Sequence, residues 1–266
     1  MTGAELVSGR VLVTGATGGI GQAIARAFAA RGATLLLTGR RVELLEPLAA
    51  EMSARTLAVD LSDRAEVARL AGEAADVDVL VNNAALPASG ALDGYSVEQI
   101  DRALEVNLRA PIVLSRLVGD GMRARGSGQL VFISSLSGKA ATGGASLYAA
   151  TKYGLRGFAA GLREDLRPQG VGVSCVFPGF VSGAGMFAES GASLPRGVGT
   201  RTPGQVAAAV LDAVERDRGE VDVAPLGLRL SAAFASVRPN AANALVRRFG
   251  GETVANELAA GQRGKR

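Results

Sequence analysis

The chain has 266 residues, 48% of them hydrophobic, and a formal net charge of +4. A chain of this length and composition suits one α/β domain with a substantial buried core. Histidine is absent and Cys175 is the only cysteine, which excludes a Ser-His-Asp triad, histidine-held metals, an internal disulfide and a multi-cysteine zinc site. We therefore expect no bound metal.

The charge and hydropathy patterns also limit the partners that we expect. The isoelectric point is near 9.7, but the basic residues are scattered between acidic ones and only 4% of the residues are aromatic, so the chain has no dense basic patch of the kind that binds nucleic acid. No apolar stretch reaches the ~20 residues needed to span a bilayer, and the N-terminus does not resemble a signal peptide. We expect a cytoplasmic protein with no nucleic-acid partner and no membrane span.

Strand and helix signals alternate along the chain. The patterns predict strands over 10–13, 33–38, 55–59, 77–81, 128–133, 171–177 and 220–223, and helices over 22–31, 42–52, 63–72, 96–125, 146–167 and 203–216. This alternation predicts a Rossmann-like, doubly wound α/β fold, in which a parallel sheet has helices on both faces. Ligands of such sheets bind at the carboxyl ends of the strands. Cys175 lies in the apolar run 171–177 and is expected to be a core residue.

A glycine-rich turn, TGATGGIG over residues 14–21, joins the first strand to the first of these helices. Its glycines Gly15, Gly19 and Gly21 follow GxxxGxG and not the strict GxGxxG spacing. Such a turn lets the backbone approach a pyrophosphate, and the free N–H groups at the helix start favour its negative charge. Taken alone, the motif also fits a turn that binds nothing.

Tyr148 and Lys152 are four residues apart in a predicted helix, and Ser135 precedes the tyrosine by thirteen residues. A spacing of four puts both side chains on one helix face, where the ammonium favours the phenolate. We expect this to lower the pKa of Tyr148 from its usual value near ~10, so that the phenol exchanges protons near neutral pH. A chance placement on one face is the alternative for this pair alone.

These motifs, together with Asn82-Asn83-Ala84-Ala85, Asn107 and Phe177-Pro178-Gly179, resemble the short-chain dehydrogenase/reductase family over roughly residues 8–225. The resemblance implies a single dinucleotide-binding domain over 1–225, with a substrate lid over 182–201 and a C-terminal extension over 226–266. Two motifs depart from the family pattern. NNAG reads NNAA, and Gly183 replaces the threonine of PGxVxT that touches the cofactor, a role in which Ser182 is expected to substitute in part.

The resemblance also implies the roles of the site residues. Ser135 would bind the substrate oxygen, Tyr148 would exchange the proton, Lys152 would hold the nicotinamide ribose and lower the pKa of the tyrosine, and Asn107 would support a water chain that replenishes the proton. The residues expected to bind the cofactor are Gly15, Thr17, Gly19, Ile20, Gly21, Arg40, Arg41, Asp60, Leu61, Asn83, Ala84, Tyr148, Lys152, Pro178, Gly179 and Val181.

The cofactor preference follows from the end of the second strand. Family members that prefer NAD carry an acidic residue at the position of Gly39, whereas Arg40 and Arg41 here offer cations suited to the 2′-phosphate of NADP. The alternative is that both arginines are solvated residues at a helix start. Asp60 matches the family's carboxylate near the adenine amino group; its alternative is a helix cap, which Ser62 or Asp63 can provide instead.

The substrate is less defined by the sequence. The lid is rich in small residues and contains Met186, Phe187 and Leu194, which favours an apolar substrate face. In the C-terminal extension, an apolar stripe at helical spacing favours a cover of the pocket or a subunit contact, and a peripheral membrane contact is the alternative. The stripe consists of Leu226, Leu230, Phe234 and Val237. Residues 261–266 are expected to be disordered.

The predicted function is an NADP-dependent oxidoreductase that interconverts a carbonyl and an alcohol of a small molecule. A non-catalytic dinucleotide-binding regulatory protein and a 3-oxoacyl-thioester reductase are the alternatives. Family members commonly pair through the helices that here span 96–125 and 146–167, so we expect a homodimer or homotetramer. The second helix carries small residues that permit close contact: Ala149, Ala150, Gly154, Gly157 and Ala160.

Overall fold

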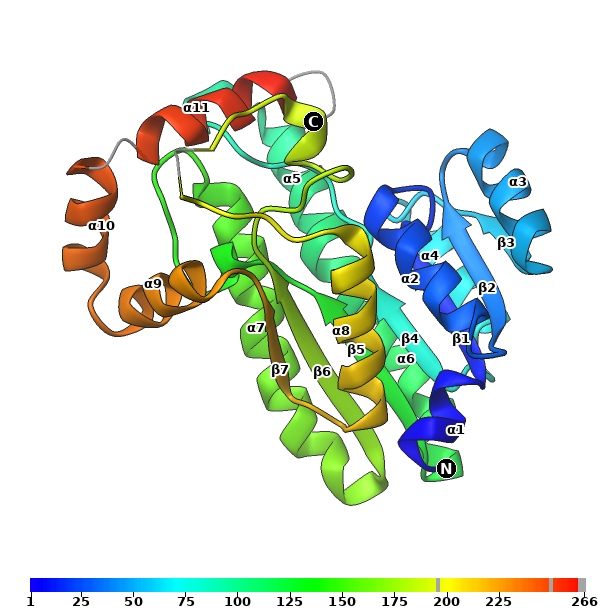
Figure 1. Ribbon diagram of the computed structural model, residues 1–266. Coiled ribbons are helices and arrows are strands. Elements are labelled where there is room, and N and C mark those ends of the chain that lie inside the picture. Colours follow the sequence, from blue (N-terminus) through cyan, green and yellow to red (C-terminus); the bar gives the residue numbers. More distant parts are fainter. Residues whose placement is uncertain (195–196, 249–250, 263–266) are drawn as a thin grey trace.

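One parallel sheet organises the computed structural model, which describes residues 1–194, 197–248 and 251–262. Within these residues, seven strands pair in the order β3-β2-β1-β4-β5-β6-β7 (Figure 1). They are β1 (Arg10–Thr14), β2 (Thr34–Gly39), β3 (Arg55–Ala58), β4 (Val79–Asn82), β5 (Gly128–Ile133), β6 (Val171–Pro178) and β7 (Glu220–Val223). The order reverses between β1 and β4, which opens a crevice at the carboxyl ends of these strands. The predicted doubly wound α/β fold is confirmed.

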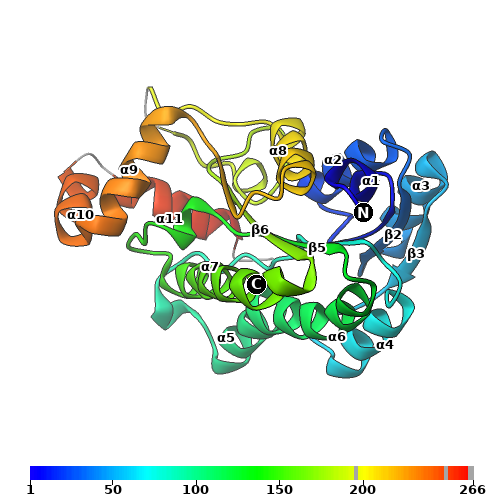
Figure 2. The same cartoon turned by 90° about the horizontal axis from the view of Figure 1, so that it is seen from below.

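Helices cover both faces of the sheet, as Figure 2 shows. One layer consists of α2 (Gly19–Ala29), α3 (Val42–Met52) and α8 (Pro203–Glu215), and the other of α4 (Arg64–Glu73), α6 (Ala110–Arg125) and α7 (Ser146–Leu166). Neighbouring residues of β1 serve opposite layers: Val11 and Val13 belong to the core under α2 and α8, and Leu12 to the core under α4 and α6. Burial on both faces explains why the strands are continuous apolar runs. A short helix α1 (Gly3–Val7), which was not predicted, packs against α8.

The region predicted as one helix over 96–125 is interrupted. It divides into α5 (Val97–Leu104), a π-helical turn (Glu105–Arg109) and α6. The turn directs Asn107 into the interior, where Oδ1 accepts a hydrogen bond from the Leu86 N–H (2.6 Å) and Nδ2 donates one to the Leu86 carbonyl (2.9 Å). A widened turn of this kind inserts an extra residue into the helical ladder. The interruption therefore fixes the loop that follows β4.

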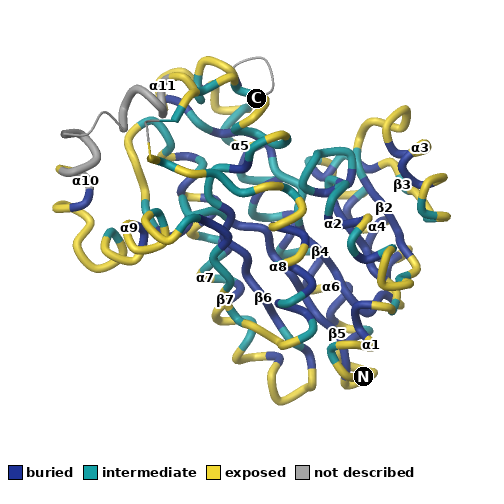
Figure 3. Tube along the Cα trace, viewed as in Figure 1, coloured by how far each residue is buried: buried dark blue, intermediate teal, exposed yellow. Residues whose placement is uncertain are grey.

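Three further helices follow β7: α9 (Leu226–Val237), α10 (Pro239–Arg248) and α11 (Gly251–Gln262). Figure 1 shows α11 lying across the carboxyl-terminal edge of the sheet, and Figure 3 shows α9 as largely exposed. The prediction of disorder over 261–266 is wrong for Gly261 and Gln262, which end α11; residues 263–266 lie outside the described residues. Among the helices described, none has the length and apolar character needed to cross a bilayer.

Candidate active site

Two adjoining cavities lie at the carboxyl ends of the strands, with volumes of about 600 and 730 Å³. The first lies along the glycine-rich turn and is lined by all the expected cofactor residues that precede β5: Gly15, Thr17, Gly19, Ile20, Gly21, Arg40, Arg41, Asp60, Leu61, Asn83 and Ala84. The second is lined by the remaining ones, Tyr148, Lys152, Pro178, Gly179 and Val181, and by Ser135. The structure thus brings these residues together in one continuous cleft, since several residues line both cavities.

The glycine-rich turn has the close approach that a pyrophosphate requires. Gly15 has φ +63°, and a Cβ there would lie 2.7 Å from Cα of Ala84, so only glycine fits. The Asn83 amide donates to the carbonyls of Thr14 (2.9 Å) and Gly15 (3.1 Å), which clamps the turn against the end of β4. Gly18 caps α2 without a side-chain hydrogen bond, so the first N–H groups of this helix are available to an anion.

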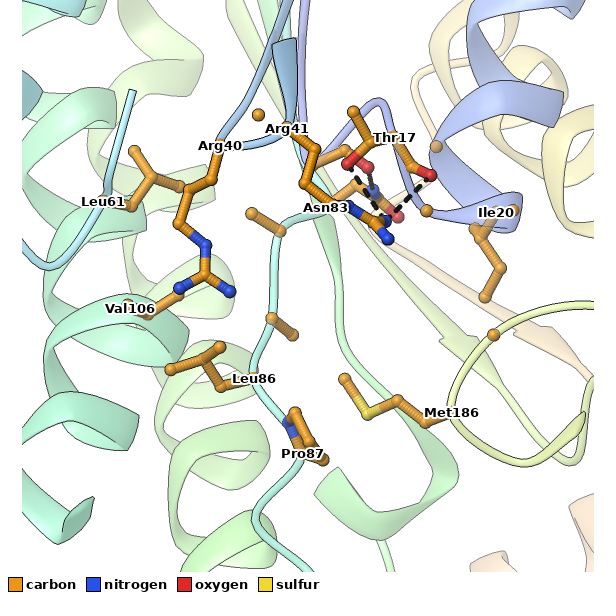
Figure 4. Close-up of a pocket in the computed structure, with 18 of the residues that line it drawn as sticks. Thr17, Ile20, Arg40, Arg41, Leu61, Asn83, Leu86, Pro87, Val106 and Met186 are labelled. Carbon is orange, nitrogen blue, oxygen red and sulfur yellow. Dashed lines mark hydrogen bonds between the residues drawn. The ribbon is translucent and has the colours of Figure 1, made fainter. Parts of the chain in front are cut away.

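Arg40 and Arg41 take different directions after β2. Figure 4 shows Arg40 pointing into the first cavity beside Leu61, whereas Arg41 turns toward Thr17, whose carbonyl oxygen and hydroxyl are 3.4 and 3.5 Å from Nη2 of Arg41. Arg40 Nη1 is 4.0 Å from Asp60 Oδ2. Both arginines line the first cavity, and the Arg40 guanidinium is the one that points into it, where a 2′-phosphate would add a second anionic partner.

Asp60 is an ionised carboxylate at the rim of the first cavity. Burial alone would raise its pKa, but hydrogen bonds from Ser62 and the nearby Arg40 and Arg102 outweigh that effect and lower the pKa of Asp60. The helix cap of α4 is Asp63, whose Oδ1 accepts from the N–H groups of Ala65 and Glu66. Asp60 is therefore not used as the cap, which removes the alternative interpretation of this residue.

The second cavity contains the proposed catalytic side chains. Ser135 lies directly after β5, and Tyr148 and Lys152 occupy the first two turns of α7. Lys152 is almost wholly buried; its Nζ donates to the Ile133 carbonyl (2.9 Å) and lies 5.6 Å from the centroid of the Tyr148 ring. Ser134, which precedes Ser135, donates a hydrogen bond from its hydroxyl to the Lys152 carbonyl (3.0 Å) and so ties α7 to the end of β5.

The prediction of a lowered pKa for Tyr148 is wrong. Burial raises the pKa of Tyr148 to about 12, and the hydrogen bond with Ser135 offsets this only in part. Burial likewise lowers the pKa of Lys152 to about 8. Both groups lose water on folding, which disfavours both charged forms, and the Lys152 ammonium is directed to Ile133. The phenol of Tyr148 is therefore protonated at neutral pH.

Two other expected site residues, Asn107 and Ser182, lie outside both cavities. Asn107 lines neither cavity, because its amide is bound to the main chain of Leu86; its role in a water chain stays a prediction. Ser182, expected to substitute for a missing threonine, directs its hydroxyl to the Arg201 carbonyl (3.4 Å), and neither Ser182 nor Gly183 lines either of these two cavities. The sequence alone did not show that the Asn107 side chain binds the main chain of Leu86 or that the Ser182 hydroxyl turns toward Arg201.

The lid and α9 form the apolar walls of the second cavity. The lid contributes Met186, Phe187, Leu194 and Val198, and α9 contributes Leu228, Ala232, Phe234 and Ala235. Of the predicted stripe on α9, only Phe234 lines the cavity, whereas Leu226, Leu230 and Val237 are 64, 61 and 75% exposed and do not cover it. Their roles as a subunit or membrane contact stay predictions.

Two expectations based on composition also bear on the chemistry. Cys175 is 1% exposed inside β6 and is a core residue, as predicted. In the part of the chain that the structure describes, no three potential metal-ligating side chains cluster. The residues that line the cleft include the glycine-rich turn in the first cavity and Ser135, Tyr148 and Lys152 in the second.

Comparisons with known proteins identify the family. Residues 9–194 match the family model of the short chain dehydrogenases. The chain is 34% identical to the ketoacyl reductase HetN of a Nostoc species over 254 residues. This alignment covers 90% of this chain and 88% of that relative. A short-chain dehydrogenase from Sphingobium yanoikuyae in complex with NADPH matches with a TM-score of 0.76 and 29% identity, over 86% of this chain and 94% of that one.

A second solved structure has a related fold. The bulky-bulky ketone specific alcohol dehydrogenase from Comamonas testosteroni matches with a TM-score of 0.72 and 26% identity, over 87% of this chain and 94% of that one. The glycine-only turn, the free helix start and Arg40 fit the phosphates of the cofactor that the Sphingobium enzyme holds. The chain belongs to the short-chain dehydrogenase/reductase family and is an oxidoreductase that uses NADP.

Proposed function

We propose that the protein reduces an apolar ketone or aldehyde to the alcohol with NADPH, and that it catalyses the reverse oxidation when the alcohol is in excess. The observation that carries this proposal is the placement of Tyr148 beside Ser135 in a cavity with apolar walls. A neutral phenol is an acid, which suits the direction in which the substrate oxygen gains a proton.

Each residue of the site has a separate role in the proposed reaction. NADPH, when bound, supplies the hydride that reaches the carbonyl carbon. The Ser135 hydroxyl donates a hydrogen bond to the substrate oxygen, and the Tyr148 hydroxyl transfers its proton to that oxygen as the carbon–oxygen double bond becomes single. The Lys152 ammonium stabilises the phenolate that this transfer leaves, and Asn107 holds the Leu86 loop that borders the first cavity.

The cavity walls support the proposed substrate class. Among the described residues that line the second cavity, Lys152 is the only charged one, and the lid and α9 add apolar side chains opposite the catalytic group. Apart from Lys152, no described residue of this lining carries a positive charge that would pair with a carboxylate or a phosphate on the substrate. The Comamonas relative, named for bulky-bulky ketones, is consistent with a ketone substrate that carries bulky groups on both sides of the carbonyl.

A substrate panel tests the proposal. Purified protein is mixed with NADPH and with apolar ketones of increasing size, small aldehydes and 2-oxo acids, and loss of NADPH absorbance is followed. We expect turnover of the apolar ketones and little or none of the charged acids. Preference for the charged acids would contradict the proposed substrate class. Binding of NADPH without turnover of any substrate would favour the non-catalytic regulatory function.

A 3-oxoacyl thioester is a second candidate substrate. The observation in its favour is the name of the Nostoc relative, a ketoacyl reductase, together with an apolar cavity that suits an acyl chain. Adding a 3-oxoacyl thioester and the matching free ketone to the panel separates the two. A thioester reductase would turn over the thioester far faster than the free ketone.

We also propose that the protein is a homo-oligomer that pairs through α6 and α7. Three of the small residues expected at the contact, Ala150, Gly157 and Ala160, are exposed on one face of α7 together with Tyr153. The other two are used internally: Ala149 is buried, and a Cβ on Gly154 would lie 2.9 Å from Leu108. Light scattering at micromolar concentration should give a dimer or tetramer mass, and a monomer mass would contradict the pairing.

A further inference from the structure

Gln262, the last residue of α11, occupies the junction of the two cavities. It is 4% exposed and lines both of them, as do Ile20, Asn83, Ala85 and Met186. Its side-chain oxygen Oε1 is buried and has no hydrogen-bond partner among the described residues. A buried acceptor without a donor is unfavourable and calls for an explanation, which a ligand in the cleft supplies.

Packing against the lid holds Gln262 in this position. A Cβ on Gly261 would lie 2.1 Å from the Ser190 carbonyl oxygen, so the end of α11 sits directly against the lid. One turn earlier, Glu257 Oε2 accepts a hydrogen bond from the Ser193 N–H (2.9 Å). Leu258, on the same helix, lines the second cavity. Gln262 is therefore held in place by a helix that packs against the lid.

The chemistry of the orphaned atom narrows its partner. A dinucleotide that starts at the glycine-rich turn and reaches Tyr148 has to cross the junction, because the two cavities meet there. Oε1 accepts hydrogen bonds and needs a donor, which phosphate groups do not offer at neutral pH. At this end of NADPH the donors are the ribose hydroxyls and the carboxamide NH₂. Lys152 and Tyr148 lie in the second cavity to meet the ribose, which leaves the carboxamide.

We propose that Gln262 accepts a hydrogen bond from the carboxamide NH₂ of the nicotinamide, so that α11 orients the ring for hydride transfer. The turn after β6 provides no competing side chain, since Ser182 bonds to Arg201 and Gly183 has none. The inference rests on the cofactor site alone, and it holds whatever substrate the enzyme takes. Its test therefore needs no turnover.

Binding of cofactor analogues tests this contact. The dissociation constants of NADP⁺ and of its 3-acetylpyridine analogue, in which a methyl group replaces the carboxamide NH₂, are measured by calorimetry for the wild type and for Gln262→Met. We expect the substitution to weaken NADP⁺ about fivefold, the worth of one hydrogen bond, and to leave the analogue within twofold. Phosphorylated ADP-ribose, which lacks the nicotinamide, should bind both proteins equally.

Two further variants guard the test against a folding artefact. Gln169→Met makes the same chemical change at an exposed glutamine that bonds to the Asp165 carbonyl, and it should change no binding constant. Gln262→Glu keeps an acceptor and should keep the preference for NADP⁺ over the analogue. Equal weakening of all three ligands by Gln262→Met would overturn the proposal, since Gln262 would then only hold α11. Unchanged NADP⁺ binding would overturn it as well.

Discussion

The two cavities of the cleft are built in different ways. Main-chain clamps surround the first: Thr14 Oγ1 accepts from the N–H groups of Asn83 (3.0 Å) and Ala84 (3.1 Å), and the Asn83 amide holds the glycine-rich turn. The second has a fixed floor in β5 and α7, but its walls come from the lid and the C-terminal helices, which contact each other through packing and through hydrogen bonds such as that from the Ser193 N–H to Glu257.

This difference matches what each cavity has to recognise. A dinucleotide is one fixed molecule, so its site gains from atoms held in place by many short-range contacts. A substrate face formed by apolar side chains on peripheral helices recognises shape through packing, which tolerates change in the wall without loss of the floor. Variants of the floor, the clamps and the wall should therefore have separable effects on chemistry, cofactor affinity and substrate preference.

Removal of the proton donor in the floor should have the largest effect. Tyr148→Phe keeps the ring but loses the hydroxyl, and we expect kcat to fall by ~10²–10⁴-fold. NADPH affinity, measured by fluorescence titration, should stay within twofold, because the ring packing is unchanged. Tyr153→Phe, on the exposed side of the same helix, serves as the control and should keep full activity. A Tyr148→Phe enzyme with most of its activity would refute the assigned role.

Removal of the cation in the first cavity should come next. Arg40→Ala should weaken NADPH by about tenfold to a hundredfold and NADH by less than twofold, because a hydrogen bond to a charged group is worth ~1.5–3 kcal/mol. Titration of both cofactors measures the ratio. Arg167→Ala, which alters a guanidinium on the far surface, should change neither affinity. Equal losses for both cofactors would show that Arg40 does not read the 2′-phosphate.

The pH dependence should report Lys152. Burial lowers the pKa of Lys152 to about 8 and raises that of Tyr148 to about 12, so the lysine is charged below pH 8 and the phenol stays protonated well above it. We expect kcat/KM for reduction to be level below pH 8 and to fall about tenfold per unit above it, as the charge that stabilises the phenolate is lost. Lys152→Met should abolish this inflection. A wild-type profile that is level to pH 10 would contradict the assignment.

Changes in the wall should give the smallest effect. Leu228→Ala enlarges the second cavity, and we expect the ratio of kcat/KM for a bulky ketone to that for a small one to change by about tenfold. NADPH affinity should not change. Leu226→Ala makes the same substitution on the exposed side of α9 and is the matched control. If both variants behaved alike, α9 would not face the substrate.

The sequence predicted the features that depend on residue type over short stretches. The turn around Gly15, the arginine after β2 and the Tyr148–Lys152 spacing are local, and the alternation of strands and helices determines which edge they share. The direction of the Tyr148 pKa shift was predicted wrongly, because the spacing of two residues indicates that they are close but not that they are buried. Gln262 was missed because its position depends on packing of Gly261 against Ser190, which are far apart in the chain.

The π-helical turn at Glu105–Arg109 also sets the angular phase between α5 and α6. Each residue of an α-helix advances the chain by about 100° around the axis, so the inserted residue determines which sides of the two helices share a direction. Deletion of one residue from the turn would allow one regular helix to run from the start of α5 to the end of α6. It would also rotate α5, which would move Ala103 away from its buried cluster with Tyr95 and Leu147 and break the hydrogen bonds of Asn107 to Leu86. The length of this segment is therefore as constrained as its composition.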